Sequence, residues 1–328
     1  MFKEDFRTYQ VAASGPDVHH DALLSTIAVT AFSTGEDGLI GNDLFPEVSV
    51  GKQSDRYAII DKGAFLRIPN TERAPRTKAK RVEFQVSSDQ YFADNFALAG
   101  EIALEDLANA DLAFGLRENT VKLVVGDMLR DQEQRIVNIV TSATNVGSGV
   151  ILAGGDLWSN YVTSDPLGDV TTAHAFMKNQ TGLIANVAAM DWDTFQIVRR
   201  HPDLLDYYKY TSGGQLDMAQ IAAAFNVDKV LISHAVVENA LEGGTSSMTS
   251  LWGNNVLLAH VSAAVGLQTR TLGLRFKWRP PGFPNDAAVN TKREEGAGTR
   301  YVEVVETHRF QDERIIAANL GYLIATTL

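Results

Sequence analysis

The longest regular pattern of apolar positions in this chain runs from Leu112 to about Thr141. Apolar residues recur there at steps of three and four, which is the spacing of one face of an α-helix. Asp111 stands where a helix N-cap is expected. With a rise of about 1.5 Å per residue, this helix is about 45 Å long and crosses a whole domain. The charged residues expected on its other face are Arg117, Glu118, Lys122, Asp127, Arg130, Asp131, Glu133 and Arg135.

Shorter patterns predict one helix before this long one and a mixed region after it. The early helix is expected from Asp21 to Phe32, with Asp21 as its cap. Its apolar positions are Leu23, Leu24, Ile27 and Val29. After the Gly-rich stretch Asn145–Gly155, helices and strands alternate, which indicates a compact α/β lobe. The predicted helices are Asp169–Lys178, Trp192–Arg200 with Asp191 as cap, and Leu216–Phe225, and the predicted strands are Leu183–Met190, Val230–Ile232 and Asn255–Val261.

Towards the C-terminus the apolar pattern changes to a period of two, which is typical of strands. A strand is predicted over residues 270–278, with its apolar side chains on one face. A polar loop is expected from Asn285 to Gly298, and a second strand is expected to begin at Tyr301. The apolar residues of the first strand are Leu272, Leu274, Phe276 and Trp278.

Two further strand candidates, Tyr57–Ile60 and Val82–Val86, flank a basic segment that contains several prolines. Residues 62–81 hold seven Lys or Arg and one acid, a local charge of +6 in a chain of net charge −11. A two-stranded ribbon cannot bury a core of its own and needs a partner surface. We therefore expect an arm that lies on a neighbouring copy; the alternative is a solvated surface hairpin. The predicted contact residues are Arg67, Arg73, Arg76, Lys78, Lys80 and Arg81.

Composition narrows the classes of chemistry that this chain can perform. Its 328 residues contain no cysteine, which excludes disulfides, a thiol nucleophile and thiolate metal sites. No apolar run reaches the ~20 residues of a membrane span. The acidic balance disfavours a dedicated nucleic-acid reader. Because nucleophile-elbow, phosphate-loop and zinc-helix motifs are missing and the seven His are dispersed, we expect no catalytic, cofactor-binding or metal residues.

The order of these elements resembles the major capsid proteins of tailed bacteriophages, which share the Hong Kong 97-type fold. The resemblance begins at Leu44–Val48 and continues through the basic ribbon, Ile102–Asp106 and the long helix. It recurs at Trp158-Ser159, Ser164–Asp169, Gln180–Gly182, His201–Leu204, Lys209-Tyr210 and Leu251–Gly253.

The resemblance implies an α+β fold with four parts. These are an N-terminal arm (1–50), an extended β-hairpin loop (51–90), a peripheral domain with a long spine helix (91–148 and 265–310), and an α/β axial domain (149–264 and 311–328). The implied protein is a structural subunit of the virion. It self-assembles in the host cytoplasm, as hexamers and pentamers, into an icosahedral shell that encloses the genome.

The resemblance also bears on partners and on the alternatives. It allows for a scaffolding protein, a portal and decoration proteins as partners. It implies that the subunit contacts packaged DNA weakly and does not contact a membrane. Some capsids of this fold cross-link Lys to Asn between subunits, and Lys62, Lys78 and Lys80 lie in the relevant ribbon; electrostatic contact is the favoured reading. An encapsulin-like compartment shell is the first alternative, although the long segment before Phe45 favours the virus. A soluble α/β enzyme would need a convergent His/Asp/Glu pocket.

Overall fold

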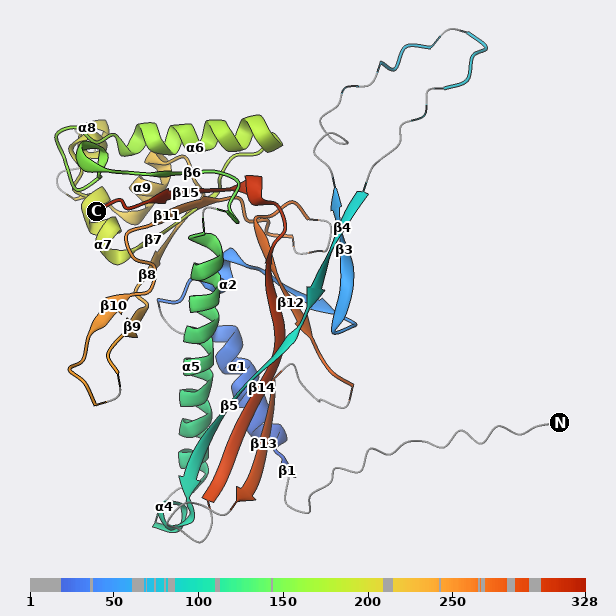
Figure 1. Cartoon of the computed structure of the whole chain (residues 1–328), viewed down its shortest axis with the longest axis vertical. Coiled ribbons are helices and arrows are strands. Elements are labelled where there is room, and N and C mark those ends of the chain that lie inside the picture. The colour runs from blue at the N-terminus through green and yellow to red at the C-terminus, as the bar shows by residue number, and fades with distance from the viewer. Residues whose placement is uncertain are drawn as a thin grey trace. The chain divides into compact units, whose positions relative to one another are not determined.

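A computed structural model describes most of the chain and divides it into two compact units. Unit 1 comprises Met1–Thr34, Phe96–Asp127 and Gly282–Arg309, and unit 2 comprises Gly35–Asn95, Met128–Pro281 and Phe310–Leu328. Figure 1 labels the helices and strands. The structure describes residues 19–35, 38–60, 68, 70–73, 75–79, 81, 86–109, 113–142, 144–208, 215–241, 243–264, 266, 269–281, 287–294 and 302–328.

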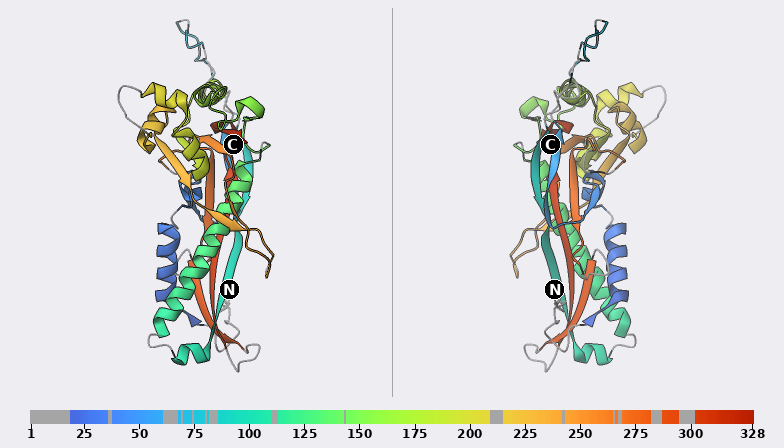
Figure 2. Two further views of the ribbon diagram at one scale, coloured as in Figure 1. Left: turned by 90° about the vertical axis from the view of Figure 1, so that its left-hand side faces the viewer. Right: turned by 90° about the vertical axis from the view of Figure 1, so that its right-hand side faces the viewer.

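Unit 1 places helix α1 against a sheet of long strands. Figure 2 shows α1 in blue alongside the orange and red strands in both views. The sheet runs β1-β13-β14, and β5 also pairs with β14. Its elements are β1 (His19–His20), α1 (Ala22–Thr34), β5 (Asp94–Ala103), α4 (Leu104–Asn109), the start of α5 (Ala113–Val140), β13 (Ala287–Glu294) and the first part of β14 (Val302–Ile315).

Helix α1 confirms the predicted cap but not the predicted apolar face. The Asp21 carboxylate accepts hydrogen bonds from the N–H groups of Leu23 and Leu24, at 2.9 and 3.0 Å. Leu24, Ala28 and Phe32 are buried at steps of four, whereas Leu23 is 58% exposed. The buried stripe follows i, i+4, i+8, and the helix packs against β13.

The polar loop predicted from Asn285 to Gly298 is wrong over its central residues. Strand β13 occupies Ala287–Glu294 and pairs with β14 from Ala287–Arg309 to Glu294–Val302. Its second half is Asn-Thr-Lys-Arg-Glu, a composition that strand propensity does not favour. Pairing with β14, and with β1 at Asn290 and Thr291, satisfies the backbone groups that such a segment would otherwise give to water.

Unit 2 is built on a five-stranded sheet of order β6-β15-β11-β7-β8. Strand β7 runs parallel to β8 and β15 runs parallel to β6, while β11 is antiparallel to β7 and β15. Helix α6 lies over the sheet in Figure 1. The sheet strands are β6 (Gly149–Ile151), β7 (Val187–Asp191), β8 (Lys229–Ser233), β11 (Val256–Ala259) and β15 (Gly321–Ala325), and the helices are α6 (Pro166–Thr181), α7 (Trp192–Val198), α8 (Pro202–Tyr207) and α9 (Met218–Ala224).

Both faces of this sheet are buried, because alternate side chains enter two different cores. Ala188 and Met190 pack with the helices α6 to α9, and Val187 and Ala189 pack with the end of α5. A sheet covered on both faces has nearly continuous apolar strands. This burial explains why Val256–Ala259 contains no polar residue.

The remaining strands and the short helices of unit 2 lie outside this sheet. Strand β12 pairs antiparallel with the second part of β14 and parallel with β2. Two separate two-stranded hairpins, β3–β4 and β9–β10, also belong to this unit. Their bounds are β2 (Glu47–Val50), β3 (Ser54–Ile60), β4 (Val86–Phe92), β9 (Val236–Glu238), β10 (Met248–Ser250) and β12 (Gly273–Trp278), with short helices α2 (Gly41–Leu44), η1 (Gly154–Asp156) and η2 (Ala318–Leu320).

Most predicted elements are confirmed to within a few residues. The long helix α5 spans Ala113–Val140, although its expected cap Asp111 lies outside the described residues. Asp191 caps α7 as predicted, by accepting a hydrogen bond from the N–H of Asp193. Helix α6 begins earlier than predicted because Asp165 caps it through the N–H of Gly168, at 2.8 Å.

Candidate functional site: subunit contact surfaces

The base of the predicted ribbon is a paired and anchored hairpin. Strands β3 and β4 pair from Ser54–Phe92 to Ile60–Val86. Tyr57 and Tyr91 are buried and point to Phe276 of β12. The rings of Tyr91 and Phe276 stack with centroids 4.6 Å apart, and the Tyr57 centroid lies 5.3 Å from that of Phe276. Aromatic packing therefore fixes the hairpin to the body of unit 2.

Hydrogen bonds reinforce this anchor. The Tyr57 hydroxyl donates to Asp89 at 3.1 Å, and burial together with this carboxylate raises the pKa of Tyr57. The Tyr91 hydroxyl donates to the carbonyl of Lys52 at 3.2 Å. The N–H of Phe92 donates to the Asp312 carboxylate at 2.9 Å. These contacts hold both strands at the point where they leave the body.

We expect Tyr91→Ala to lower the free energy of unfolding of unit 2 by about 3 kcal/mol, the usual cost of truncating a buried aromatic ring. All four Trp residues lie in unit 2, so tryptophan fluorescence during urea unfolding reports this unit. Phe92→Ala is the matched control, because this neighbouring ring is 49% exposed. Equal losses from the two variants would contradict the anchoring role of Tyr91.

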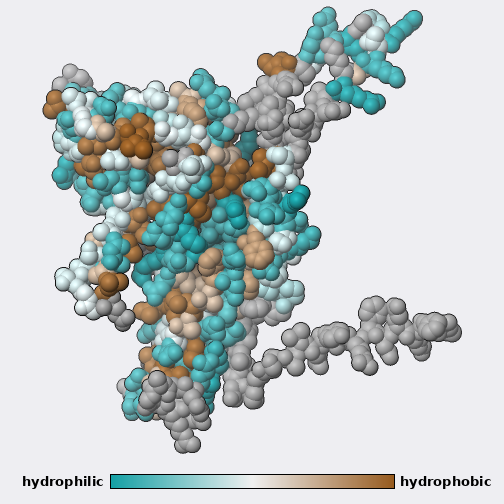
Figure 3. All heavy atoms as spheres, viewed as in Figure 1, coloured by the Kyte–Doolittle hydropathy of each residue, from teal (hydrophilic) through white to brown (hydrophobic). Residues whose placement is uncertain are grey.

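Beyond the anchor, the predicted contact residues that the structure describes are all exposed. Arg73, Arg76, Lys78 and Arg81 are exposed, and Arg76 lies at a turn with a positive φ of 65°. Arg67 and Lys80 lie outside the described residues. Figure 3 shows mostly hydrophilic side chains on the described part of this tip. Together, a rigid base and an exposed cationic tip make this ribbon a candidate contact surface.

The predicted second strand of the ribbon lies mostly outside the described residues. Only Val86 of the expected strand Val82–Val86 is described, and it begins β4. Strand β4 then continues to Phe92, through Ser87 and Ser88. Pairing with β3 holds this polar stretch extended, since Ser87 lies opposite Ile59 and Ser88 opposite Ala58.

A buried carboxylate joins three segments of unit 2. Glu133 of α5 is 2% exposed, although its place among charged residues predicted an outward position. It accepts hydrogen bonds from the N–H of Ile40 at 3.1 Å, the N–H of Gly41 at 2.7 Å and the indole of Trp252 at 2.8 Å. Burial raises the pKa of Glu133, and the three donors oppose that increase. Such a group ties the segment before β2 and the segment before β11 to the long helix.

Gly41 is part of this arrangement. A Cβ atom at this position would lie 2.5 Å from the nearer Glu133 oxygen, which is closer than real Cβ contacts. The backbone can therefore approach the carboxylate only because residue 41 has no side chain. Sequence reasoning missed Glu133, and the Gly41 and Trp252 requirements are visible only from contacts 92 and 119 residues apart.

Strand β12 is covered on both of its faces. Leu274 and Phe276 are buried as expected, yet Arg275 and Lys277 are only 4% and 9% exposed. Both cations pair with Glu47 of the neighbouring strand β2. The parallel pairing of β12 with β2 places this carboxylate where it neutralises the second face.

One Ser-His-Asp trio has the connectivity of a hydrolase triad but the opposite hydrogen-bond polarity. His201 Nε2 lies 2.9 Å from Ser164 Oγ, and its Nδ1 lies 3.6 Å from an Asp203 oxygen. Nδ1 accepts the N–H of Asp203 as the cap of α8, so Nε2 carries the proton. Ser164 Oγ itself donates to the carbonyl of Asn160 at 2.7 Å. The trio therefore holds α8 in place and does not activate a serine.

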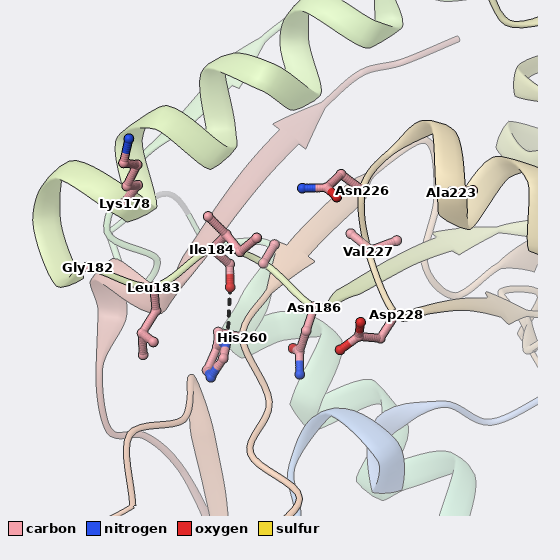
Figure 4. A pocket seen from close by; sticks show the side chains of 11 residues that line it. Lys178, Gly182, Leu183, Ile184, Asn186, Ala223, Asn226, Val227, Asp228 and His260 are labelled. Carbon is pink, nitrogen blue, oxygen red and sulfur yellow. Dashed lines mark hydrogen bonds between the residues drawn. The ribbon is translucent and has the colours of Figure 1, made fainter. Parts of the chain in front are cut away.

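A surface pocket of about 710 Å³ lies near the C-terminal end of α6. Figure 4 shows His260 beneath Ile184, whose carbonyl accepts a hydrogen bond from His260 Nδ1 at 2.9 Å. The Asn186 side chain is bonded to the backbone of Val261 in both directions, at 2.8 Å each. These polar groups serve the fold and do not converge on a ligand position.

Neither a metal-binding cluster nor a membrane-spanning helix is found among the described residues. In that part of the chain, no three His, Asp or Glu side chains are grouped so that they could hold a metal ion. No helix among the same residues is both long and apolar enough for a membrane span.

The curated relatives of this chain described below are phage major capsid proteins. No protein-family model matches the sequence. The major capsid protein of Pseudomonas phage JBD67 is 24% identical over 307 residues, which cover 92% of this chain and 95% of the relative. The major capsid protein of Burkholderia phage BcepMu is 23% identical over 316 residues, with 93% and 95% covered.

Solved structures share the fold. A phage-related protein from Bordetella bronchiseptica RB50 matches with a TM-score of 0.73 and 23% identity over 94% of this chain and 97% of its own. The capsid of phage XM1 matches with a TM-score of 0.51 and 13% identity, over 88% and 91%. An encapsulin from Synechococcus elongatus matches with a TM-score of 0.50 and 12% identity, over 87% and 85%. This chain therefore has the Hong Kong 97-type fold and is a homologue of phage major capsid proteins.

Proposed function

We propose that this chain is the major capsid protein of a tailed double-stranded DNA phage. One observation carries the proposal: relatives with that function match more than nine-tenths of the chain and of their own length. Fold similarity to phage capsid structures supports it independently. The subunit works by association with other copies of itself and not by catalysis.

We propose that the chain has the four parts of the Hong Kong 97-type fold. Residues 1–50 are the N-terminal arm and 51–90 the extended hairpin, whose base is β3–β4. Residues 91–148 and 265–310 are the peripheral domain, with α5 as its spine helix. Residues 149–264 and 311–328 are the axial domain, which contains the five-stranded sheet. We propose that arms and edges of these parts close hexamers and pentamers.

The chemistry of the contacts follows from their size and charge. Obligate interfaces bury about 2,000–5,000 Å² or more, and in a shell this area is shared among several neighbours. Exposed single ion pairs contribute only about 0–1 kcal/mol each. The ribbon residues Arg67, Arg73, Arg76, Lys78, Lys80 and Arg81 would therefore chiefly steer docking and fix its register on an acidic neighbour.

Further partners belong to the same proposal. A scaffolding protein, a portal and decoration proteins would act during or after assembly in the host cytoplasm. With a net charge of −11, the chain would contact packaged DNA only weakly and without sequence preference.

An encapsulin-like shell is the second candidate, and the fold similarity to a solved encapsulin supports it. The two functions differ in what the shell encloses. Particles recovered from infected or induced cells would contain DNA in the first case and an enzyme cargo in the second. Nuclease-protected DNA inside the particles would decide for the virus.

We expect the purified chain, expressed alone, to form closed particles or rings of five and six subunits. Many weak contacts act together in such assemblies, so association persists at low subunit concentration. Size-exclusion chromatography followed by negative-stain microscopy measures this directly. A monomer or dimer that stays unassembled even with co-expressed scaffolding protein would contradict the proposed function.

A further inference from the structure

The hairpin β9–β10 is a second element that projects from unit 2. Figure 1 shows it on the opposite side of the five-stranded sheet from β3–β4. Its strands pair from Val236–Ser250 to Glu238–Met248 and belong to no larger sheet. Two-stranded hairpins are marginally stable by themselves in water. The stability of this hairpin therefore depends on its attachment to the body of unit 2 and on a surface that covers it.

Hydrogen bonds fix the base of this hairpin to the body of unit 2. Ser250 Oγ donates to the Asp191 carboxylate, which also caps α7, at 2.5 Å. The N–H of Leu251 donates to the carbonyl of Ala235 at 2.9 Å. Beside this base the rings of Trp192 and His234 lie 5.0 Å apart. The hairpin is thus held in one orientation relative to the sheet.

The tip is ordered by its own polar groups. The Glu238 carboxylate accepts hydrogen bonds from the N–H groups of Ser247 and Ala240 and from the Ser246 hydroxyl, and these donors lower its pKa. Asn239 bridges to Thr249 at 2.6 Å. These bonds tie the two sides of the hairpin together beyond the paired strands.

That surface combines exposed apolar side chains with negative charge. Val236, Leu241 and Met248 are 56%, 88% and 63% exposed. Residues 236–250 contain two acids and no Lys or Arg. Apolar side chains gathered on a projecting element are typical of interaction surfaces.

The basic ribbon of a second copy is complementary to this surface in charge and also exposes an apolar side chain. Its tip is basic, and among its described residues Ile68 is 95% exposed. We propose that β9–β10 receives the basic ribbon of the next copy, with Leu241 and Met248 packing against it and the net negative charge of residues 236–250 attracting Arg73, Arg76 and Lys78. This inference rests on the proposed shell function. Two complementary elements on opposite sides of one unit make a head-to-tail contact, and such contacts give rings where the rotation between copies closes.

Because the chain has no cysteine, engineered disulfides test this contact without background. Subunits with Lys78→Cys are mixed with subunits carrying Met248→Cys, assembled and oxidised. We expect a cross-linked dimer band from the mixture and none from either variant alone. The double variant should give a ladder of covalent oligomers. Tyr207→Cys, at a side chain 71% exposed elsewhere in unit 2, is the control in place of Met248→Cys.

The cross-linking outcomes separate this inference from the proposed function. Failure of the unmodified chain to form particles would count against the function itself. Normal particles with no cross-link from Arg73→Cys or Lys78→Cys to Leu241→Cys or Met248→Cys would overturn the hairpin contact alone. Dimers from Met248→Cys by itself, or a stronger band with Tyr207→Cys, would overturn it as well.

A second variant tests the apolar part of the contact. We expect Leu241→Ser with Met248→Ser to reduce particle yield by about tenfold, as truncation of interface anchors does. Both side chains are exposed in the subunit, so its tryptophan fluorescence and unfolding midpoint should stay unchanged. An unchanged yield would contradict the role of these two residues.

Discussion

Replacement of Arg73, Arg76 and Lys78 by Glu is expected to leave a folded subunit that no longer assembles. The three side chains are exposed, and the fold of unit 2 does not depend on burying them. The substitutions reduce the charge of residues 62–81 from +6 to zero. An acidic neighbour would then lose the attraction that steers the ribbon and sets its register. Sedimentation and negative-stain microscopy of the variant measure the loss.

The matched control keeps the charge and changes the shape of the same side chains. Arg73→Lys, Arg76→Lys and Lys78→Arg should still assemble if charge is what matters. The wild-type protein should also assemble more slowly as salt is raised, since screening weakens exposed charge contacts. Particles of normal size and yield from the Glu variant would refute the assignment of the ribbon as a contact surface.

Glu133→Ala is expected to be among the most destabilising substitutions in unit 2. It would leave the N–H groups of Ile40 and Gly41 and the indole of Trp252 without their buried acceptor. Each unsatisfied buried donor costs about 1–3 kcal/mol. A loss of about 3–5 kcal/mol in the free energy of unfolding is therefore expected. The urea midpoint followed by tryptophan fluorescence gives the measurement, because all four Trp lie in this unit.

Two further variants separate hydrogen bonding from charge. Glu133→Gln keeps one acceptor oxygen but turns an NH₂ group towards Gly41, so an intermediate loss of about 1–2 kcal/mol is expected. Asp131→Asn, two residues away, changes a side chain that is 62% exposed and should cost no more than about 0.5 kcal/mol. If Glu133→Ala were as mild as Asp131→Asn, Glu133 would not be the link between the three segments.

Glu133 joins the end of the chain's N-terminal segment, the long helix and the approach to β11, all within unit 2. The ribbon base and the hairpin base are fixed in the same unit through Tyr91 and Asp191. Both proposed contact elements are therefore fixed to the body of unit 2.

Local sequence was sufficient for several elements whose structure depends on neighbouring residues, although it did not reveal the Asp165 cap of α6. The i, i+3 and i, i+4 spacing determined α5 almost to the residue, and Asp21 and Asp191 marked helix starts because capping needs only the next three residues. The basic segment between two strands was also evident without a structure, and so was the resemblance to phage capsid proteins.

Tertiary structure decided the features that depend on partners far along the chain. Strand β13 is polar and forms because β14 pairs with it, and Arg275 and Lys277 are buried because Glu47 neutralises them. Glu133 looks like a surface residue until three donors from distant segments surround it. A one-dimensional pattern records the side chain but not its neighbours, and the free energy of a buried polar group depends on those neighbours.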